Sequence, residues 1–285
     1  MTERPGPAPS TTSDRELSYL DFKRYFPYTP TALAVRECVR LAKLAPYACE
    51  APILDVGCGD GLFARLAFRS DEVWGIDIDA NEGRYAQASR AYSQIIIGDI
   101  VRARLPEGFF RTCVANCSLE HVPDIGAALR SIHAALAPGG VAYLFVPTDD
   151  WAQHLGTVQM ARTLGADWLA RALQSGIDGV FRHHHLYGRA EWSRLAEEAG
   201  FEVVEASEIG SVASLRAFEA FLPISLLGWM NKQLTGRWTN LPRLRARMSF
   251  PAYLAVQAML RSSADDTRVA EIFLAVRKPV AAADR

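Results

Sequence analysis

Short apolar runs alternate with helical patterns through the middle of the chain. Most of these runs are continuously apolar, which is typical of strands that are covered on both faces. Repeated strand–helix units of this kind predict an α/β fold with a doubly wound, mostly parallel sheet, which we expect to have seven strands. The expected strands are 53–57, 73–77, 94–98, 112–116, 140–146, 201–206 and 271–277.

Helical patterns separate the strands. They are expected at 60–69, 80–91, 124–137 and 189–199, with a looser helical pattern over 150–176. The helix at 124–137 is the best specified, because Asp124 is a suitable N-cap and apolar residues recur every three or four positions after it. Pro138-Gly139-Gly140 then ends the helix and turns the chain.

The alternation defines a core, which we expect to comprise residues 51–209 and 266–279. Residues 1–14 are rich in Pro, Ser and Thr and predict a disordered tail. A helical pattern over 15–50 predicts an N-terminal lid. Residues 210–265 are more than a connection between two strands of one sheet needs, so we expect a helical cap inserted before the last strand.

The most specific chemical signal lies where the first strand ends. The strand carries Asp55, and three glycines alternate directly after it: Gly57, Gly59 and Gly61. Such glycines let a strand turn sharply into a helix and let a ligand approach the backbone. Asp77 closes the second strand twenty residues beyond Gly57, where nucleoside-binding folds present an acid to ribose hydroxyls. These two linked signals predict a site for a nucleoside cofactor.

Together with three later segments, this pattern resembles the class I S-adenosylmethionine-dependent methyltransferases. The resemblance is to the small-molecule group that includes quinone-biosynthesis methylases, and it covers about residues 50–206 and the last strand. The segments, in the order of the family's motifs, are Asp55–Gly61, Asp77-Ile78, Gly98-Asp99-Ile100, Asn116–Val122 and Leu136–Gly140. One departure is Arg111-Thr112, which stands where the family usually has an acidic residue opening the fourth strand.

The resemblance implies a Rossmann-like methyltransferase fold with S-adenosyl-L-methionine as cofactor. It implies that the glycine loop with Asp55 holds the methionine end and that Asp77 and Ile78 lie at the ribose. Asp99 and Ile100 would bind the adenine. Asn116 and the loop after it would lie beside the reactive sulfonium.

The competing cofactor is a dinucleotide, which would make the protein an NAD-dependent oxidoreductase. A pyrophosphate site needs the spacing G-x-G-x-x-G, and here the third glycine falls one residue early. Asp55 and Asp60 flank the loop, and carboxylates repel a pyrophosphate but tolerate a sulfonium with an ammonium group. The loop therefore favours S-adenosylmethionine.

Two histidines are candidates for catalysis. His121 follows the fourth strand, close to the expected methyl group, and is either a general base for a hydroxyl or a packing residue. His185, in the run His183-His184-His185, is a second candidate that would face the substrate beside Tyr187. Consecutive histidines diverge, and no nearby cysteine or H-x-x-x-H pair completes a ligand set, so we predict no metal site.

The insertion has its own composition. No acidic residue lies between Glu219 and Asp265, whereas six residues there are basic. Apolar stretches at 221–230 and 250–260 flank the basic middle. Three compatible interpretations remain: a cap packed over the active site, a peripheral membrane contact through 220–261, or a pocket for an acidic or lipid-linked substrate.

Composition narrows the remaining function classes. A formal net charge of −1 gives no whole-chain case for nucleic acid as a partner, and the segment that starts at Asn116 lacks the N-P-P-Y loop of base-amine methylases. Five cysteines without a C-x-x-C pair indicate reduced, buried thiols.

We expect a cytoplasmic protein, with the inner face of a membrane as its contact if the insertion is interfacial. The expected function is O- or C-methylation of a small molecule, and a non-catalytic partner subunit of the same fold is the alternative from a different class.

Overall fold

The computed structural model describes residues 17–181, 183–262 and 269–280. The chain divides into two compact units. Among the described residues, the helical unit contains 17–48 and 213–262, and the sheet unit contains 49–181, 183–212 and 269–280. The tail predicted for residues 1–14 lies outside the described residues.

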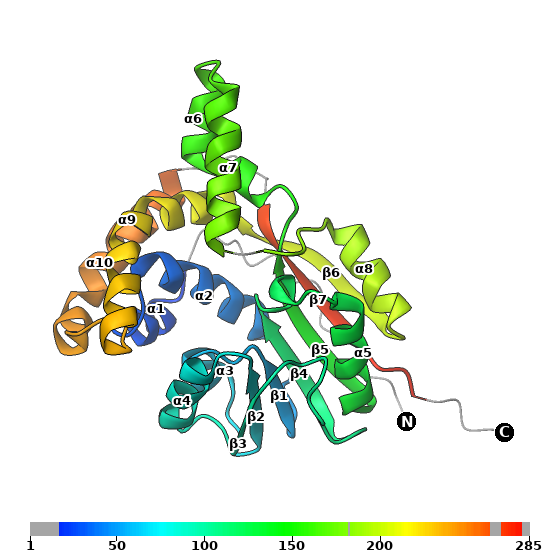
Figure 1. The fold of residues 1–285 in the computed structure, drawn as a ribbon. Coiled ribbons are helices and arrows are strands. Elements are labelled where there is room, and N and C mark those ends of the chain that lie inside the picture. Colours follow the sequence, from blue (N-terminus) through cyan, green and yellow to red (C-terminus); the bar gives the residue numbers. More distant parts are fainter. Residues whose placement is uncertain (1–16, 182, 263–268, 281–285) are drawn as a thin grey trace. The chain divides into compact units, whose positions relative to one another are not determined.

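The sheet unit is built on seven strands in the order β3-β2-β1-β4-β5-β7-β6 (Figure 1). The strands are β1 (Ile53–Val56), β2 (Val73–Asp77), β3 (Gln94–Ile97), β4 (Phe110–Asn116), β5 (Leu136–Pro147), β6 (Glu202–Ser211) and β7 (Val269–Arg277). β7 runs antiparallel to both of its neighbours, and the other pairs are parallel. This confirms the predicted doubly wound, mostly parallel sheet.

β4 and β5 begin earlier than the pattern predicts. Phe110 pairs with Leu136 ahead of a register shift, and β5 begins directly after α5, which ends at Ala135. Periodicity did not reveal this because the paired residues lie before the continuous apolar runs.

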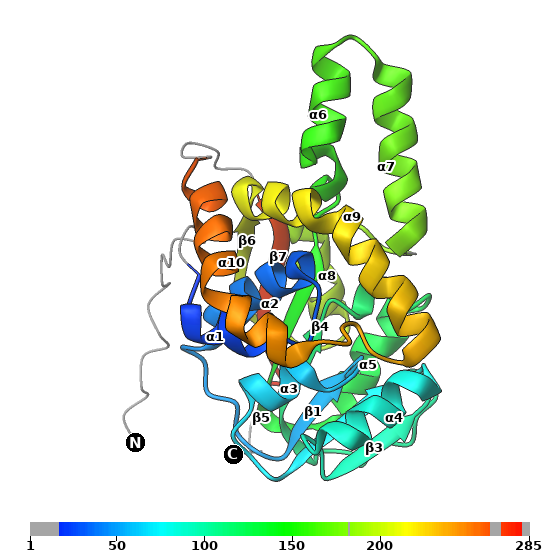
Figure 2. The same cartoon turned by 90° about the vertical axis from the view of Figure 1, so that its left-hand side faces the viewer.

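Helices cover both faces of the sheet (Figures 1 and 2). α3 and α4 lie on one face, and α5 and α8 lie on the other. α6 and α7 form a helical hairpin that projects from the sheet unit. The helices of this unit are α3 (Leu62–Ala67), α4 (Ala80–Ser89), α5 (Ile125–Ala135), α6 (Gly156–Thr163), α7 (Asp167–Phe181) and α8 (Arg189–Glu198), with short 3₁₀ helices η1 (Leu119–His121) and η2 (Trp151–His154).

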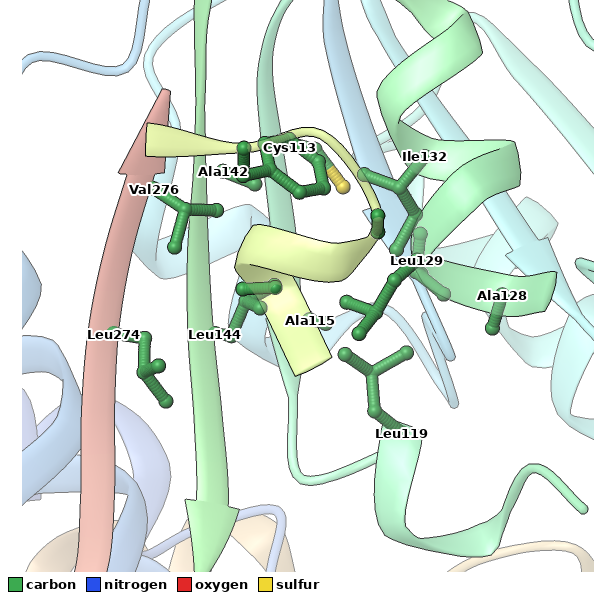
Figure 3. Packing of buried hydrophobic residues seen from close by; sticks show 14 of the residues in the cluster. Cys113, Ala115, Leu119, Ala128, Leu129, Ile132, Ala142, Leu144, Leu274 and Val276 are labelled. Carbon is green, nitrogen blue, oxygen red and sulfur yellow. The ribbon is translucent and has the colours of Figure 1, made fainter. Parts of the chain in front are cut away.

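The core between α5 and the sheet fixes the edge on which the predicted motifs lie. Asp124 caps α5 by accepting a hydrogen bond from the backbone N–H of Ala127, as its sequence position predicts. Leu129 and Ile132 of α5 face buried residues of β4, β5 and β7, and Leu119 extends this core to η1 (Figure 3). Burying each such side chain stabilises the fold by about 1.5–3 kcal/mol, so the start of η1 is held firmly.

The helical unit consists of α1 (Tyr19–Tyr25), α2 (Thr31–Leu44), nearly all of α9 (Val212–Thr235) and α10 (Pro242–Ser262). The N-terminal segment and the insertion, predicted as separate parts, pack together here. Arg245 of α10 donates to the carbonyl oxygens of Phe26 and Thr29, and Tyr253 donates to that of Leu17. Of the described helices, only α9 has the length and apolar composition that a membrane span requires.

Candidate cofactor site

The glycine loop after β1 adopts a backbone that other residues disfavour. Gly57, Gly59 and Gly61 have φ angles of 74°, 52° and 77°. A Cβ atom at Gly57 would lie 2.2 Å from Cβ of Ser118, and one at Gly61 would lie 2.6 Å from Oγ of Ser89. At Gly59 a Cβ would meet no atom within 4 Å. Gly57 and Gly61 are therefore needed for packing, whereas Gly59 leaves open backbone for a ligand.

Asp77 ties the end of β2 to this loop. Its Oδ2 accepts a hydrogen bond of 2.8 Å from the N–H of Gly59, and its Oδ1 accepts one of 2.8 Å from the N–H of Asp79. Each carboxylate oxygen keeps a second lone pair that can accept from a ligand hydroxyl. The neighbouring Ile78 is 76% exposed and offers an apolar surface beside these acceptors. The pair suits a ribose with an adjacent ring.

Asp99 lies after β3, where the resemblance places the adenine. Its Oδ1 accepts from the N–H of Val101, and Nε of Arg102 lies 4.0 Å from its Oδ2. A Cβ at the preceding Gly98 would meet nothing within 4 Å, so this turn also presents open backbone. Ile100 is 5% exposed and belongs to the core, so its side chain supports the turn from beneath.

Asp55 lies under the glycine loop. It is 2% exposed and accepts a 2.7 Å hydrogen bond from the hydroxyl of Tyr92. Burial, reinforced by Asp55, raises the pKa of Tyr92 far above its usual range, so Tyr92 remains a donor. In this geometry Asp55 shapes the loop rather than facing a ligand. The sequence pattern missed Tyr92, which lies just past the predicted helix 80–91 and in no motif.

Ser118 joins the first and fourth motifs. Asn116 ends β4, and two residues later Oγ of Ser118 donates a 2.6 Å hydrogen bond to the carbonyl oxygen of Val56. The Cβ of Ser118 also occupies the space against Gly57. The loop after β4 is therefore fastened to the glycine loop, and no local pattern in the sequence signals this contact.

The departure at Arg111-Thr112 is also accounted for by local contacts. Nε of Arg111 lies 2.8 Å from Oε2 of Glu50, and Thr112 donates to the carbonyl oxygen of Glu50. These residues hold the start of β4 at the edge of the sheet opposite the cofactor motifs.

The histidine segment after α7 lies against η1. The backbone N–H groups of His184 and His185 both donate to the carbonyl oxygen of Glu120. The ring of His121 stacks on that of His183 with centroids 5.4 Å apart, and its Nε2 lies 3.8 Å from Oε1 of Glu120. We call Glu120, His121 and His183 the Glu120 cluster. Burial, assisted by the nearby His121, lowers the pKa of His183 despite the opposing effect of Asp178.

His121 and His185 differ in their environments. The side chain of His121 is 41% exposed, so an acceptor can approach it. The ring nitrogens of His185 are 2.8 Å from the hydroxyl of Tyr187 and 2.9 Å from the carbonyl oxygen of Pro123. Because both nitrogens of His185 have partners, its geometry favours a role in holding the loop over a role in proton transfer.

The predicted site residues thus gather at one edge of the sheet, where parallel strands end. Asp77, Asp99 and Asn116 follow or close β2, β3 and β4, and the glycine loop follows β1. Open backbone at Gly59 and Gly98 alternates with carboxylates, which fits a nucleoside that carries a positive charge. The fold is that of a doubly wound α/β protein, and its candidate cofactor site lies at this edge of the sheet.

Comparison with known proteins identifies the family. A family model described as a methyltransferase domain matches residues 32–206, which is more than half of the chain. The chain belongs to this methyltransferase family.

Individual relatives match only part of their length. An uncharacterized methyltransferase of Mycobacterium tuberculosis is 44% identical over 138 residues, which are 46% of this chain and 65% of that protein. A ubiquinone biosynthesis O-methyltransferase of Pseudomonas syringae is 30% identical over 160 residues, which are 53% of this chain and 64% of that protein. The chain therefore spans less than two thirds of these relatives.

A solved structure with the same fold is that of the cyclase SpnF. The TM-score is 0.55 at 18% identity, and the match covers 87% of this chain and 82% of that one. At this identity the likeness concerns the fold alone.

Proposed function

We propose that the protein is an S-adenosyl-L-methionine-dependent methyltransferase that acts on an oxygen or carbon atom of a small-molecule acceptor. The observation that carries the proposal is the glycine loop held by Asp77, with open backbone at Gly59. Family membership and the name of the Pseudomonas syringae relative support it.

When bound, S-adenosylmethionine supplies a methyl group activated by a sulfonium. The chain's residues must hold the cofactor and align the acceptor. Asp77 would accept from the ribose hydroxyls and Asp99 from the adenine amine, while Gly59 lets the methionine end lie against the backbone. Tyr92 and Ser118 keep this loop in place through Asp55 and Val56.

An acceptor hydroxyl must also lose a proton. Glu120 and His121 of the Glu120 cluster lie in the motif after β4, and the cluster is the group of titratable side chains that we assign to this task. We expect His121→Ala to reduce kcat by about 10²–10⁴-fold, which is the usual contribution of a positioned acid or base. The measurement is transfer of a labelled methyl group, together with S-adenosylmethionine affinity by calorimetry.

His184→Gln is the matched control, because His184 contacts Glu120 through its backbone N–H. This variant should keep both affinity and turnover. Full turnover in His121→Ala with normal cofactor binding would refute the assigned role of the cluster. Absence of S-adenosylmethionine binding to the wild-type protein would refute the enzyme itself.

Two alternatives remain to be separated by the same assay. A non-catalytic partner subunit would release no S-adenosylhomocysteine with any acceptor in a panel of quinols, lipids and glycolipids. A different reaction on the same fold, as the name of SpnF illustrates, would bind the cofactor and transform an acceptor without methylating it.

We further propose that the insertion brings the protein to an anionic membrane surface, where an apolar or lipid-linked acceptor is available. Between residues 224 and 254 eleven large apolar side chains are exposed: Ile224, Leu226, Leu227, Trp229, Met230, Leu234, Leu241, Leu244, Met248, Phe250 and Leu254. Exposed apolar sets of this size mark interaction sites. No acidic residue lies among them.

The charge arrangement on α10 favours anionic headgroups as the partner. Leu244 and Met248 are one turn apart, and the exposed Arg243 and Arg247 have the same spacing beside them. Arg245 has a different role, because it donates to two carbonyl oxygens inside the helical unit and burial lowers its pKa. In α9, 39% of the most apolar stretch is buried inside the protein. This burial favours contact with the membrane surface over a helix that crosses the membrane.

The membrane contact predicts a charge-dependent partition. Arg243→Glu/Arg247→Glu should reduce co-sedimentation with vesicles containing anionic lipid by at least about 30-fold, since each arginine near such a surface contributes about 1 kcal/mol. Arg130→Glu/Arg189→Glu, at exposed positions on α5 and α8, is the charge-matched control and should sediment like wild type. Equal partitioning of all three proteins would count against the membrane contact.

A further inference from the structure

The loop after β4 and the segment after α7 bring three metal-ligating side chains together. One ligand atom from each of Glu120, His121 and His183 lies within 4.8 Å of the other two. Glu120 is 2% exposed, and the side chain of His183 is also buried. Buried carboxylates in proteins are paired or coordinate metals. A buried carboxylate with two imidazoles is therefore a candidate ligand set.

The backbone under this set is held from several sides. Leu119, which opens η1, is buried in the core beneath the cluster. The N–H groups of His184 and His185 donate to the carbonyl oxygen of Glu120 over 2.8 Å and 3.1 Å. The backbone of two distant segments is thus held in place before an ion binds, so that only the ligand side chains need to rotate.

The carboxylate of Asp178 lies near the ring of His183. Oδ1 of Asp178 in α7 lies 3.6 Å from Nδ1 of His183, and neither atom has a hydrogen-bond partner among the described residues. A carboxylate that faces one ring nitrogen orients the ring and leaves the other nitrogen for a metal. The rings of Trp151 and Phe181 pack against His183 and surround this side with apolar atoms.

We propose that the Glu120 cluster binds one divalent transition-metal ion. Two imidazoles and one carboxylate suit zinc, manganese, iron(II) or cobalt, whereas calcium and magnesium prefer sites made of oxygen ligands. Ligand atoms around such an ion are about 3–3.5 Å apart, given metal–ligand distances of about 2.0–2.2 Å. Closing the set from its present separations requires shifts of about 1 Å, which side-chain rotation provides. Three protein ligands leave at least one position open.

The open position gives the ion a role that rests on the proposed methyltransferase function. When the acceptor's hydroxyl group binds the ion at this open position, its pKa falls and it releases its proton to water. That oxygen's electron pair then forms the bond to the methyl carbon, while the carbon–sulfur bond breaks and its electron pair stays on sulfur. The acceptor is therefore a compound with a hydroxyl group. In this step the Glu120 cluster removes the proton through the ion, so His121 contributes as an ion ligand rather than as the base itself.

The test measures metal binding without turnover. The full chain, free of any histidine tag and stripped with a chelator, is titrated with Co²⁺ and Zn²⁺ by calorimetry and visible absorption. We expect one ion per chain, and a loss of affinity above about 100-fold in His183→Ala and in Glu120→Gln, since loss of even a supporting residue costs about 10–100-fold. His184→Gln should bind like wild type. Because Glu120 is buried, His121→Ala, at a partly exposed position, provides a variant that keeps the fold.

Unchanged affinity in His183→Ala and His121→Ala, or no saturable binding to wild type at millimolar Co²⁺, would overturn the site. A second arm compares methyl transfer by stripped and reloaded enzyme. Saturable binding with equal turnover in both forms would keep the metal site and refute its part in the transfer. Failure of the methyltransferase function itself would appear separately, as absent S-adenosylmethionine binding with metal binding intact.

Discussion

Gly57→Ala is expected to lower the free energy of unfolding by about 2–5 kcal/mol and to abolish cofactor binding. Two costs add at this position. The backbone has a φ of 74°, which costs a residue with a Cβ about 1–2 kcal/mol. The new methyl group would also lie 2.2 Å from Cβ of Ser118, so the loop after β4 must move. Urea unfolding and calorimetry with S-adenosylmethionine measure the two effects.

Two further variants separate strain from overlap at Gly57. Gly57→Ala/Ser118→Gly removes the overlapping Cβ and should recover part of the lost stability, although it also removes the hydrogen bond from Ser118 to Val56. Gly176→Ala is the control for the effect of replacing glycine by alanine without strain or overlap. Gly176 lies in α7, and no atom lies within 4 Å of the new methyl group. It should raise stability by up to about 1 kcal/mol. If Gly57→Ala unfolds like Gly176→Ala, the packing role of Gly57 is wrong.

The sequence predicted the sheet because most strands are covered on both faces and therefore appear as continuous apolar runs. β2 begins and ends at the predicted residues, while β4 and β5 begin earlier because Phe110 and Leu136 pair outside those runs. The cofactor motifs were predictable for a related reason. Each one lies within a few residues of a strand end, so that local spacing alone brings Gly57, Asp77 and Asp99 to one edge.

Contacts between distant segments could not be predicted in this way. Ser118 meets Val56 and Tyr92 meets Asp55 across the sheet edge, and neither pair has a periodic signal. The sequence neighbours of the histidine run do not indicate the cluster, because the partners of His183 come from η1, about sixty residues earlier. The packing of α10 on α1 depends likewise on Arg245 and on Phe26, which are far apart in the chain.

Asp77→Asn is expected to weaken S-adenosylmethionine binding by about 100-fold while the protein stays folded, because hydrogen bonds to charged groups contribute about 1.5–3 kcal/mol each. Both carboxylate oxygens of Asp77 accept from backbone N–H groups. An asparagine has one oxygen and one NH₂ group, so one backbone donor would face another donor. Calorimetry measures the affinity, and urea unfolding measures the accompanying loss of stability.

Loss of the ribose contact must be distinguished from a loosened loop. Asp79→Ala is the control for local disturbance: it removes the cap of α4, whose N–H groups at Asn81 and Glu82 contact Asp79, and should cost about 1 kcal/mol of stability without changing affinity. A thermodynamic cycle compares the affinities of two proteins, wild type and Asp77→Asn, for two ligands, S-adenosylhomocysteine and its 2′-deoxy analogue. It isolates the contribution of the contact between Asp77 and the ribose hydroxyl. If Asp77 accepts from the ribose, removing the hydroxyl should weaken binding to wild type more than binding to Asp77→Asn. Equal losses in both proteins would mean that Asp77 acts only through Gly59, as part of the scaffold that keeps the loop open.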